Sequence, residues 1–150
     1  MADTFSQIYI HVIFAVKGRE NQINQFWEEE LYKYISGTVK NKDQKLIAIN
    51  GMPDHIHLLL GLKPSCCLSN LVREIKKSSD NFIKEKKFTK SKFQWQEGFG
   101  AFSSNHSGLG NIINYINNQK NHHTKQSFRD EYTQFLTLFK VEFQPEHLFD

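Results

Sequence analysis

Apolar side chains follow two spacings along this chain, and the order of the two spacings limits the folds that the chain can adopt. Alternating or extended patterns predict strands, and spacings of three and four residues predict helices. The predicted strands cover residues 5–16, 45–51, 55–62 and 93–103, and the predicted helices cover 25–41 and 68–86. This β-α-β-β-α-β order indicates an α+β, ferredoxin-like fold, in which an antiparallel sheet carries two helices on one face.

Two further helices are predicted after this unit, over residues 109–121 and 128–139. The second has a weak capping box in Ser127 and Asp130. The first reads NIINYINNQKNHH over most of its length, which is too polar for a core helix. A fold does not need such a helix for packing, so functional residues are expected there.

Length and composition predict one domain over residues 1–150. No apolar run approaches the roughly 20 residues that span a bilayer. Asp3 precedes the first apolar stretch and no basic leader stands before it, so no signal peptide is expected. Cys66 and Cys67 are adjacent, and a disulfide between adjacent cysteines would be strained. These features predict a cytoplasmic protein without a membrane contact.

Basic side chains are concentrated in one segment. The net charge is only +3, yet residues 73–92 hold eight basic residues against three acidic ones. Such a segment predicts either a polyanion-binding site or a solvated lysine face. The candidates for contacts with DNA phosphates are Arg73, Lys76, Lys77, Lys84, Lys86 and Lys87.

His55 and His57 are two residues apart in a predicted strand, so both imidazoles stand on one face of the sheet. Tyr115 and Gln119 are four residues apart in the polar helix and also share a face. Either pair alone is common in proteins without any functional role. Together they supply two imidazoles, a neutral oxygen ligand and a phenol, a set that can bind a divalent cation and attack a phosphodiester.

Four stretches of the sequence resemble one known family, in the same order and with similar gaps. PDHIHLLL at 53–60 resembles the His-hydrophobic-His motif of HUH endonucleases, and NYINNQKNHH at 114–123 resembles the tyrosine helix of single-tyrosine transposases from the smallest bacterial insertion sequences. WQEGFGAFS at 95–103 and SFRDEY at 127–132 are similar to further stretches of that family, the IS200-like and REP-associated tyrosine transposases.

The resemblance implies a metal-dependent tyrosine transposase. It implies that His55, His57 and Gln119 bind the metal, that Tyr115 is the nucleophile, and that the protein is nucleoid-associated when it acts on DNA. His123 is four residues beyond Gln119, so it is an alternative ligand or a phosphate contact. The implied metal is Mg²⁺ or Mn²⁺. The implied substrate is single-stranded DNA with hairpins at the element ends, cleaved and rejoined through a 5′-phosphotyrosine without a nucleotide cofactor. A homodimer is also implied, in which the tyrosine of one subunit commonly completes the site of the other.

Three alternatives remain at this stage. A host-adopted relative would process genomic palindromic repeats with the same chemistry. A metal-dependent phosphoesterase would use water and leave Tyr115 idle. A non-catalytic module would bind single-stranded nucleic acid, since the ferredoxin-like sheet is also the RNA recognition fold. Trp95, Phe99 and Phe102 can either stack on unpaired bases or pack in the core.

Overall fold

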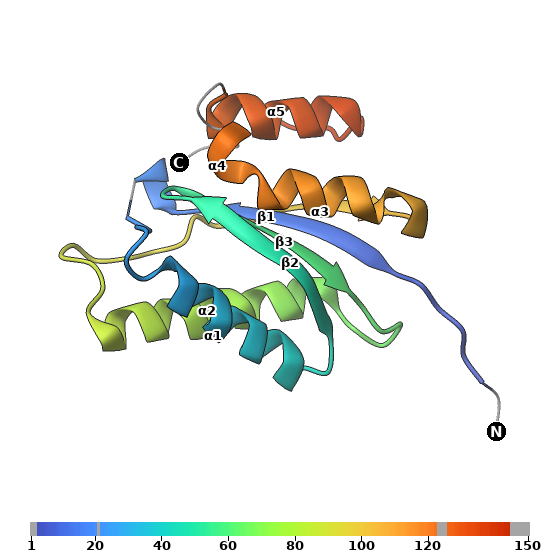
Figure 1. Ribbon diagram of the computed structural model, residues 1–150, viewed down its shortest axis with the longest axis horizontal. Helices are drawn as coiled ribbons and strands as arrows, with labels where there is room; N and C mark the ends of the chain where they lie inside the picture. Colours follow the sequence, from blue (N-terminus) through green and yellow to red (C-terminus); the bar gives the residue numbers. More distant parts are fainter. Residues whose placement is uncertain (1–2, 21, 123–125, 145–150) are drawn as a thin grey trace.

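The computed structural model describes residues 3–20, 22–122 and 126–144. Its centre is a four-stranded sheet with the order β2-β3-β1-β4, and all pairs of neighbouring strands are antiparallel. The strands are β1 (Tyr9–Ala15), β2 (Lys45–Met52), β3 (His55–Gly61) and β4 (Gly100–Ser104). The sequence-based prediction of a ferredoxin-like α+β fold is therefore confirmed (Figure 1).

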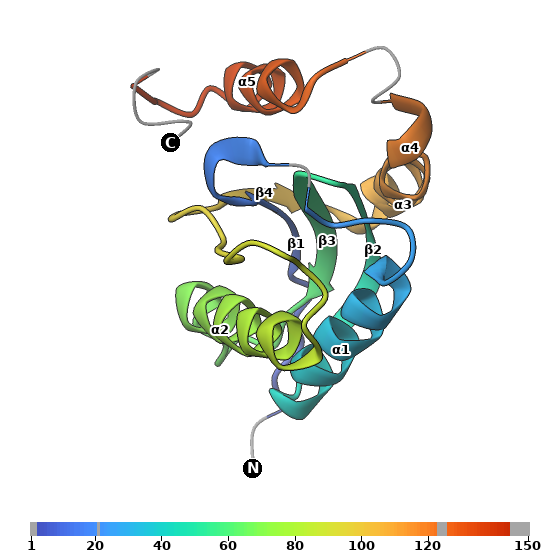
Figure 2. The ribbon, with the colours of Figure 1, turned by 90° about the vertical axis from the view of Figure 1, so that its left-hand side faces the viewer.

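Helices α1 (Glu28–Asn41) and α2 (Leu68–Lys86) cover one face of the sheet, as Figure 2 shows. Helix α1 begins with three acids, which suit the positive end of its dipole. Its apolar side chains pack with those of α2 and with alternate residues of β1 and β3 to form the main core. Ile56, Leu58 and Leu60 of β3 belong to this core and have no exposed surface.

The other face of the sheet carries the C-terminal elements. They are the short 3₁₀ turn η2 (His106–Gly108) and the helices α3 (Leu109–Asn117), α4 (Gln119–His122) and α5 (Phe128–Leu138). The prediction of one continuous helix over residues 109–121 was wrong, because the helix is interrupted at Asn118. Ser127 caps α5 as predicted, since its side chain accepts a hydrogen bond from the backbone N–H of Asp130.

The predicted last strand is shorter than expected. Only Gly100–Ser104 pairs with β1, and before it the backbone makes a single bridge between Trp95 and Val16. A second 3₁₀ turn, η1 (Lys17–Arg19), follows β1. In the part of the chain that the structure describes, no helix is both long enough and apolar enough to cross a membrane.

The β2–β3 hairpin is tight and brings two backbones together. Pro53 and Asp54 alone connect the strands. A side chain at Gly51 would lie 2.3 Å from the carbonyl oxygen of His55 and 2.9 Å from the Cα of Ile56, so only glycine fits there. This close contact fixes the position of the strand that carries the two histidines.

Candidate metal and tyrosine site

His55 and His57 lie on the sheet face that carries α3, α4 and α5. Alternation along β3 sends Ile56 to the main core and the two imidazoles to the opposite face. Both histidines have no exposed surface, and their ring centroids are 5.2 Å apart. The predicted placement of both rings on one face therefore holds in the structure.

The Nδ1 atom of each ring has its own partner. His55 Nδ1 is 2.7 Å from Asp54 Oδ1, and His57 Nδ1 is 2.8 Å from His11 Nε2. Partners of this kind hold metal-binding imidazoles in one orientation. As a result, the Nε2 atoms of both rings face the same side chain, which is Glu131.

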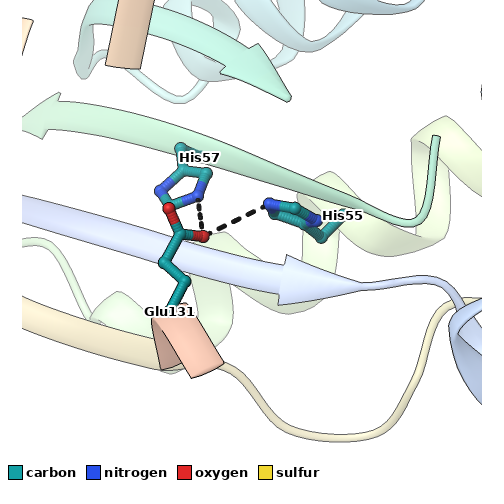
Figure 3. A group of neighbouring side chains, drawn as sticks. All are labelled: His55, His57 and Glu131. Atoms are coloured by element: carbon teal, nitrogen blue, oxygen red, sulfur yellow. Dashed lines mark hydrogen bonds and ion pairs between the residues drawn. The ribbon is translucent and has the colours of Figure 1, made fainter. Parts of the chain in front are cut away.

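Glu131 reaches the histidines from α5, and Figure 3 shows one of its carboxylate oxygens in contact with both rings. Its Oε1 atom is 2.9 Å from His57 Nε2 and 3.4 Å from His55 Nε2. The three donor atoms lie within 4.8 Å of one another, and all three side chains are buried. Two imidazole nitrogens and a carboxylate oxygen form a donor set that suits a divalent cation.

Tyr115 of α3 and Gln119 of α4 complete the group. Gln119 is buried, with Oε1 3.4 Å from His55 Nε2, and its Nε2 donates a 3.2 Å hydrogen bond to Glu131 Oε2. The Tyr115 hydroxyl donates to the same carboxylate oxygen. Glu131 thus directs one oxygen toward the imidazoles and the other toward the phenol. The structure brings together all four residues that the sequence singled out.

Burial and hydrogen bonds together set the pKa values of this site. It opposes protonation of His55, but hydrogen bonds to Asp54 and Glu131 outweigh burial and raise the pKa of that ring. Burial, aided by the neighbouring His57, lowers the pKa of His11 to about 3, so His11 is neutral at neutral pH. Burial and the Glu131 carboxylate raise the pKa of Tyr115, so the phenol keeps its proton.

Side chains of β2 and α4 fix the interrupted helix against the sheet. Asn50 Nδ2 donates to the backbone carbonyls of Ile116 and Asn117, at 3.0 and 3.2 Å, at the end of α3. Lys120 donates to the carbonyl oxygen of Gly51 and, at 3.0 Å, to Glu28 Oε2. These contacts hold Tyr115 and Gln119 over the histidines of their own chain.

The predicted DNA contacts lie elsewhere. All six are on or just after α2, which covers the sheet face opposite the histidines (Figure 2). Lys76 donates to the backbone carbonyls of Gln96 and Gly98, and Lys84 pairs with Asp80 at 2.9 Å. Arg73, Lys77, Lys86 and Lys87 are exposed. The structure does not bring any of these side chains to the site.

Two residues of the site were not predicted. Glu131 was noted only as part of SFRDEY, and His11 only as part of the predicted strand over residues 5–16. A signal for Glu131 does exist, because it falls on the buried face of α5 with Phe128 and Leu136. Acids are rarely fully buried unless they are paired. His123, the alternative ligand, lies outside the described residues.

Comparisons with known proteins bear on the family and the fold of this chain. A family model described as "Transposase IS200 like" matches residues 4–119, a span that includes both histidines, Tyr115 and Gln119 but ends before Glu131. A search of curated proteins gives no significant match.

Two solved structures share the fold. A candidate transposase from Deinococcus radiodurans R1, solved at 1.90 Å, has 21% identity and a TM-score of 0.61, and the match covers 79% of this chain and 95% of that one. A REP-associated tyrosine transposase bound to a REP hairpin has 18% identity and a TM-score of 0.59, over 81% of this chain and 75% of that one.

Proposed function

The chain belongs to the IS200-like transposase family, and on that premise we propose that it cleaves and rejoins single-stranded DNA through a covalent link to Tyr115. The observation that carries the proposal is the convergence of Tyr115, His55 and His57 on the single carboxylate of Glu131. A phosphate placed beside this carboxylate would lie next to both the phenol and the paired imidazoles. That juxtaposition is what a tyrosine nucleophile with a metal site requires.

His55, His57 and Glu131 would hold a divalent cation, and the Gln119 amide oxygen lies close enough to His55 to join them. The metal in the proposal is Mg²⁺ or Mn²⁺, and the imidazole pair favours Mn²⁺ more than oxygen ligands alone would. When bound, this cation would polarise the scissile phosphate and stabilise the negative charge that develops on it.

The phenol oxygen of Tyr115 forms the new bond to phosphorus, and the bond between phosphorus and the 3′ oxygen breaks. The departing oxygen takes a proton and becomes a free 3′-hydroxyl. Glu131 accepts the Tyr115 hydrogen bond and is therefore placed to receive the phenol proton. In rejoining, a 3′-hydroxyl attacks the phosphotyrosine and releases the phenol. The link conserves the phosphodiester energy, so no nucleotide cofactor is needed.

The DNA substrate in this proposal is a single strand that contains a hairpin. The related tyrosine transposase was solved with a REP hairpin, which supports this choice of substrate. The basic residues on or just after α2 are proposed to contact hairpin phosphates. Two of them, Lys76 and Lys84, also make the contacts within the protein that are described above. The homodimer that the resemblance implies belongs to the same proposal.

A denaturing gel tests the function. The substrate is a hairpin oligonucleotide with randomised single-stranded flanks, incubated with the protein and Mg²⁺ or Mn²⁺. We expect a covalent protein–DNA band that Tyr115→Phe abolishes. His57→Ala should lose the band and keep hairpin binding, since the imidazole faces the site and not α2. Cleavage without an adduct would instead support a phosphoesterase, and binding without cleavage would support a non-catalytic module.

A further inference from the structure

A hollow of about 320 Å³ lies beside Tyr115, between β1, β4, α3 and α5. The ring of Tyr115 forms part of its wall, and His11 links it to the metal site through the contact between His11 Nε2 and His57 Nδ1. The hollow therefore opens next to the phenol that we propose as the nucleophile.

Three phenylalanines give the hollow aromatic walls. The ring centroids of Phe102 are 5.2 Å from Phe135 and 5.0 Å from Phe139, and the rings of Phe135 and Phe139 are within 6° of parallel. Phe139 is 45% exposed and the adjacent Leu138 is 72% exposed, so this apolar surface faces solvent. Exposed aromatic faces of this kind are where unpaired bases stack.

Primary amides supply the polar part of the lining. Asn111 and Gln134 are exposed and Gln126 is half-buried, and all three line the hollow. An amide side chain both donates and accepts hydrogen bonds, which matches the mixed edge of a nucleobase. No side chain with a full charge is among the described residues of the lining. The lining thus suits a flat uncharged ring with a polar edge better than a phosphate or a carboxylate.

We propose that this hollow binds one unpaired nucleobase of the DNA strand, next to the phosphate that Tyr115 attacks. The inference rests on the proposed function, because that function places DNA at Tyr115. The nucleotides on either side of the attacked phosphate would lie next to the phenol, and the Tyr115 ring forms part of the wall of the hollow. The base of one of these nucleotides can therefore reach the hollow. Stacking on Phe139 and Phe135 then positions the phosphate in front of the phenol.

The test uses binding and needs no cleavage. The probe is a short strand of abasic sugars that carries a single central 2-aminopurine, whose fluorescence falls when it stacks on an aromatic ring. It is titrated with the full-length protein in EDTA. We expect quenching with the wild-type protein, and roughly five- to a hundredfold weaker binding with Phe139→Leu, because one base–aromatic stack is removed. Phe139→Tyr should bind like the wild type because it keeps the aromatic face.

Phe82→Ala is the matched control, because Phe82 stacks on Tyr34 at 4.2 Å between α1 and α2, on the far side of the sheet. This variant should quench the probe as the wild type does. Absence of quenching with the wild type, equal binding by Phe139→Leu and the wild type, or an equal loss in Phe82→Ala would overturn the inference. Quenching that depends on Phe139 without any Tyr115 adduct would support base binding in the hollow and contradict the proposed cleavage. A Tyr115 adduct without such quenching would support the cleavage and contradict base binding in the hollow.

Discussion

Burial of Glu131 takes its carboxylate out of water, and a buried charge is stable only when it is paired or hydrogen-bonded. The structure pairs each oxygen separately, Oε1 with the two histidines and Oε2 with Tyr115 and Gln119. The family match ends at Gln119, so the match itself carries no information on this acid. Its role as a ligand rests on geometry alone and can be tested directly.

The Glu131→Gln variant should bind Mn²⁺ at least about tenfold more weakly, because an amide replaces the one negative ligand. Electron paramagnetic resonance of free Mn²⁺ measures the affinity without any DNA. Glu74→Gln, on α2 and away from the site, is the control and should bind Mn²⁺ as the wild type does. Equal affinity in Glu131→Gln and Glu74→Gln would remove Glu131 from the ligand set.

His11 should make the metal-free protein less stable in acid. Its pKa falls from 6.5 in the unfolded chain to about 3 in the folded one, chiefly through burial, with His57, Glu131 and Tyr115 packed around it. The unfolded chain therefore takes up a proton below pH 6.5 while the folded one does not. The His11 contribution to stability is complete above that pH and is lost as the pH falls toward 3.

Urea unfolding in EDTA between about pH 7 and about pH 5 measures this effect. His11→Gln removes the titrating group, so its free energy of unfolding should fall less steeply with acid than that of the wild type. His55 has a raised pKa and acts in the opposite direction, so the difference between the two proteins is the quantity to compare. Parallel curves for the two proteins would contradict the prediction.

At the scale of elements, the decisive feature is the attachment of α3 and α4 to β2. Helix α3 ends at Asn117, where its last carbonyls lack partners within the helix. Asn50 supplies two hydrogen bonds to those carbonyls, and Lys120 ties α4 to the hairpin at Gly51. The break at Asn118 thus directs both Tyr115 and Gln119 toward the same carboxylate.

Asn50→Ala should lower the free energy of unfolding by about 1 kcal/mol, because the half-buried carbonyl of Ile116 and the exposed carbonyl of Asn117 lose their donor. Urea denaturation of the full chain gives this value. Asn81→Ala, an exposed position within α2, is the control, and alanine there should leave stability unchanged or slightly higher. If Asn50→Ala were as stable as Asn81→Ala, the helix would not depend on this anchor.

The features that could be predicted from the sequence are those that depend on local periodicity. The succession of strands and helices along the chain, the shared face of His55 and His57, and the cap at Ser127 all follow from spacings of a few residues. The break at Asn118 was missed because the side chain that binds the carbonyls beside it, Asn50, is far away in the chain. The contacts of Glu131 with β3 cross more than seventy residues, and no local pattern encodes them. The acid on the apolar face of α5 was the one available sign.

At the scale of the whole molecule, the sheet separates two surfaces. One carries α1 and α2 with the basic residues that were predicted to contact DNA, and the other carries the histidines, Tyr115 and α5 (Figure 1). Within one chain, Tyr115 lies beside Glu131 and the two histidines, so a single chain holds a complete site. The exchange of tyrosines between subunits that the resemblance implies stays a prediction.

A mixing experiment tests whether Tyr115 acts on DNA bound at the site of its own chain. Tyr115→Phe and His57→Ala are each expected to form no adduct, because each lacks one half of the site. If the tyrosine acts within its own chain, the mixture of the two should also form none, at any ratio and after co-refolding. If subunits exchanged tyrosines, the mixture would rebuild one complete site from the tyrosine of one variant and the imidazole of the other.

A size tag on His57→Ala makes the second outcome readable, since only that variant retains the nucleophile and can become linked to DNA. Wild type mixed with either variant is the positive control and should form the adduct on the wild-type chain. An adduct on the tagged chain would show that Tyr115 serves a second subunit, and the contacts of Asn50 and Lys120 would then have to open for the helix to cross. If the wild-type control is active and the tagged chain forms no adduct, the tyrosine acts within its own chain, where contacts with β2 hold α3 and α4 in place.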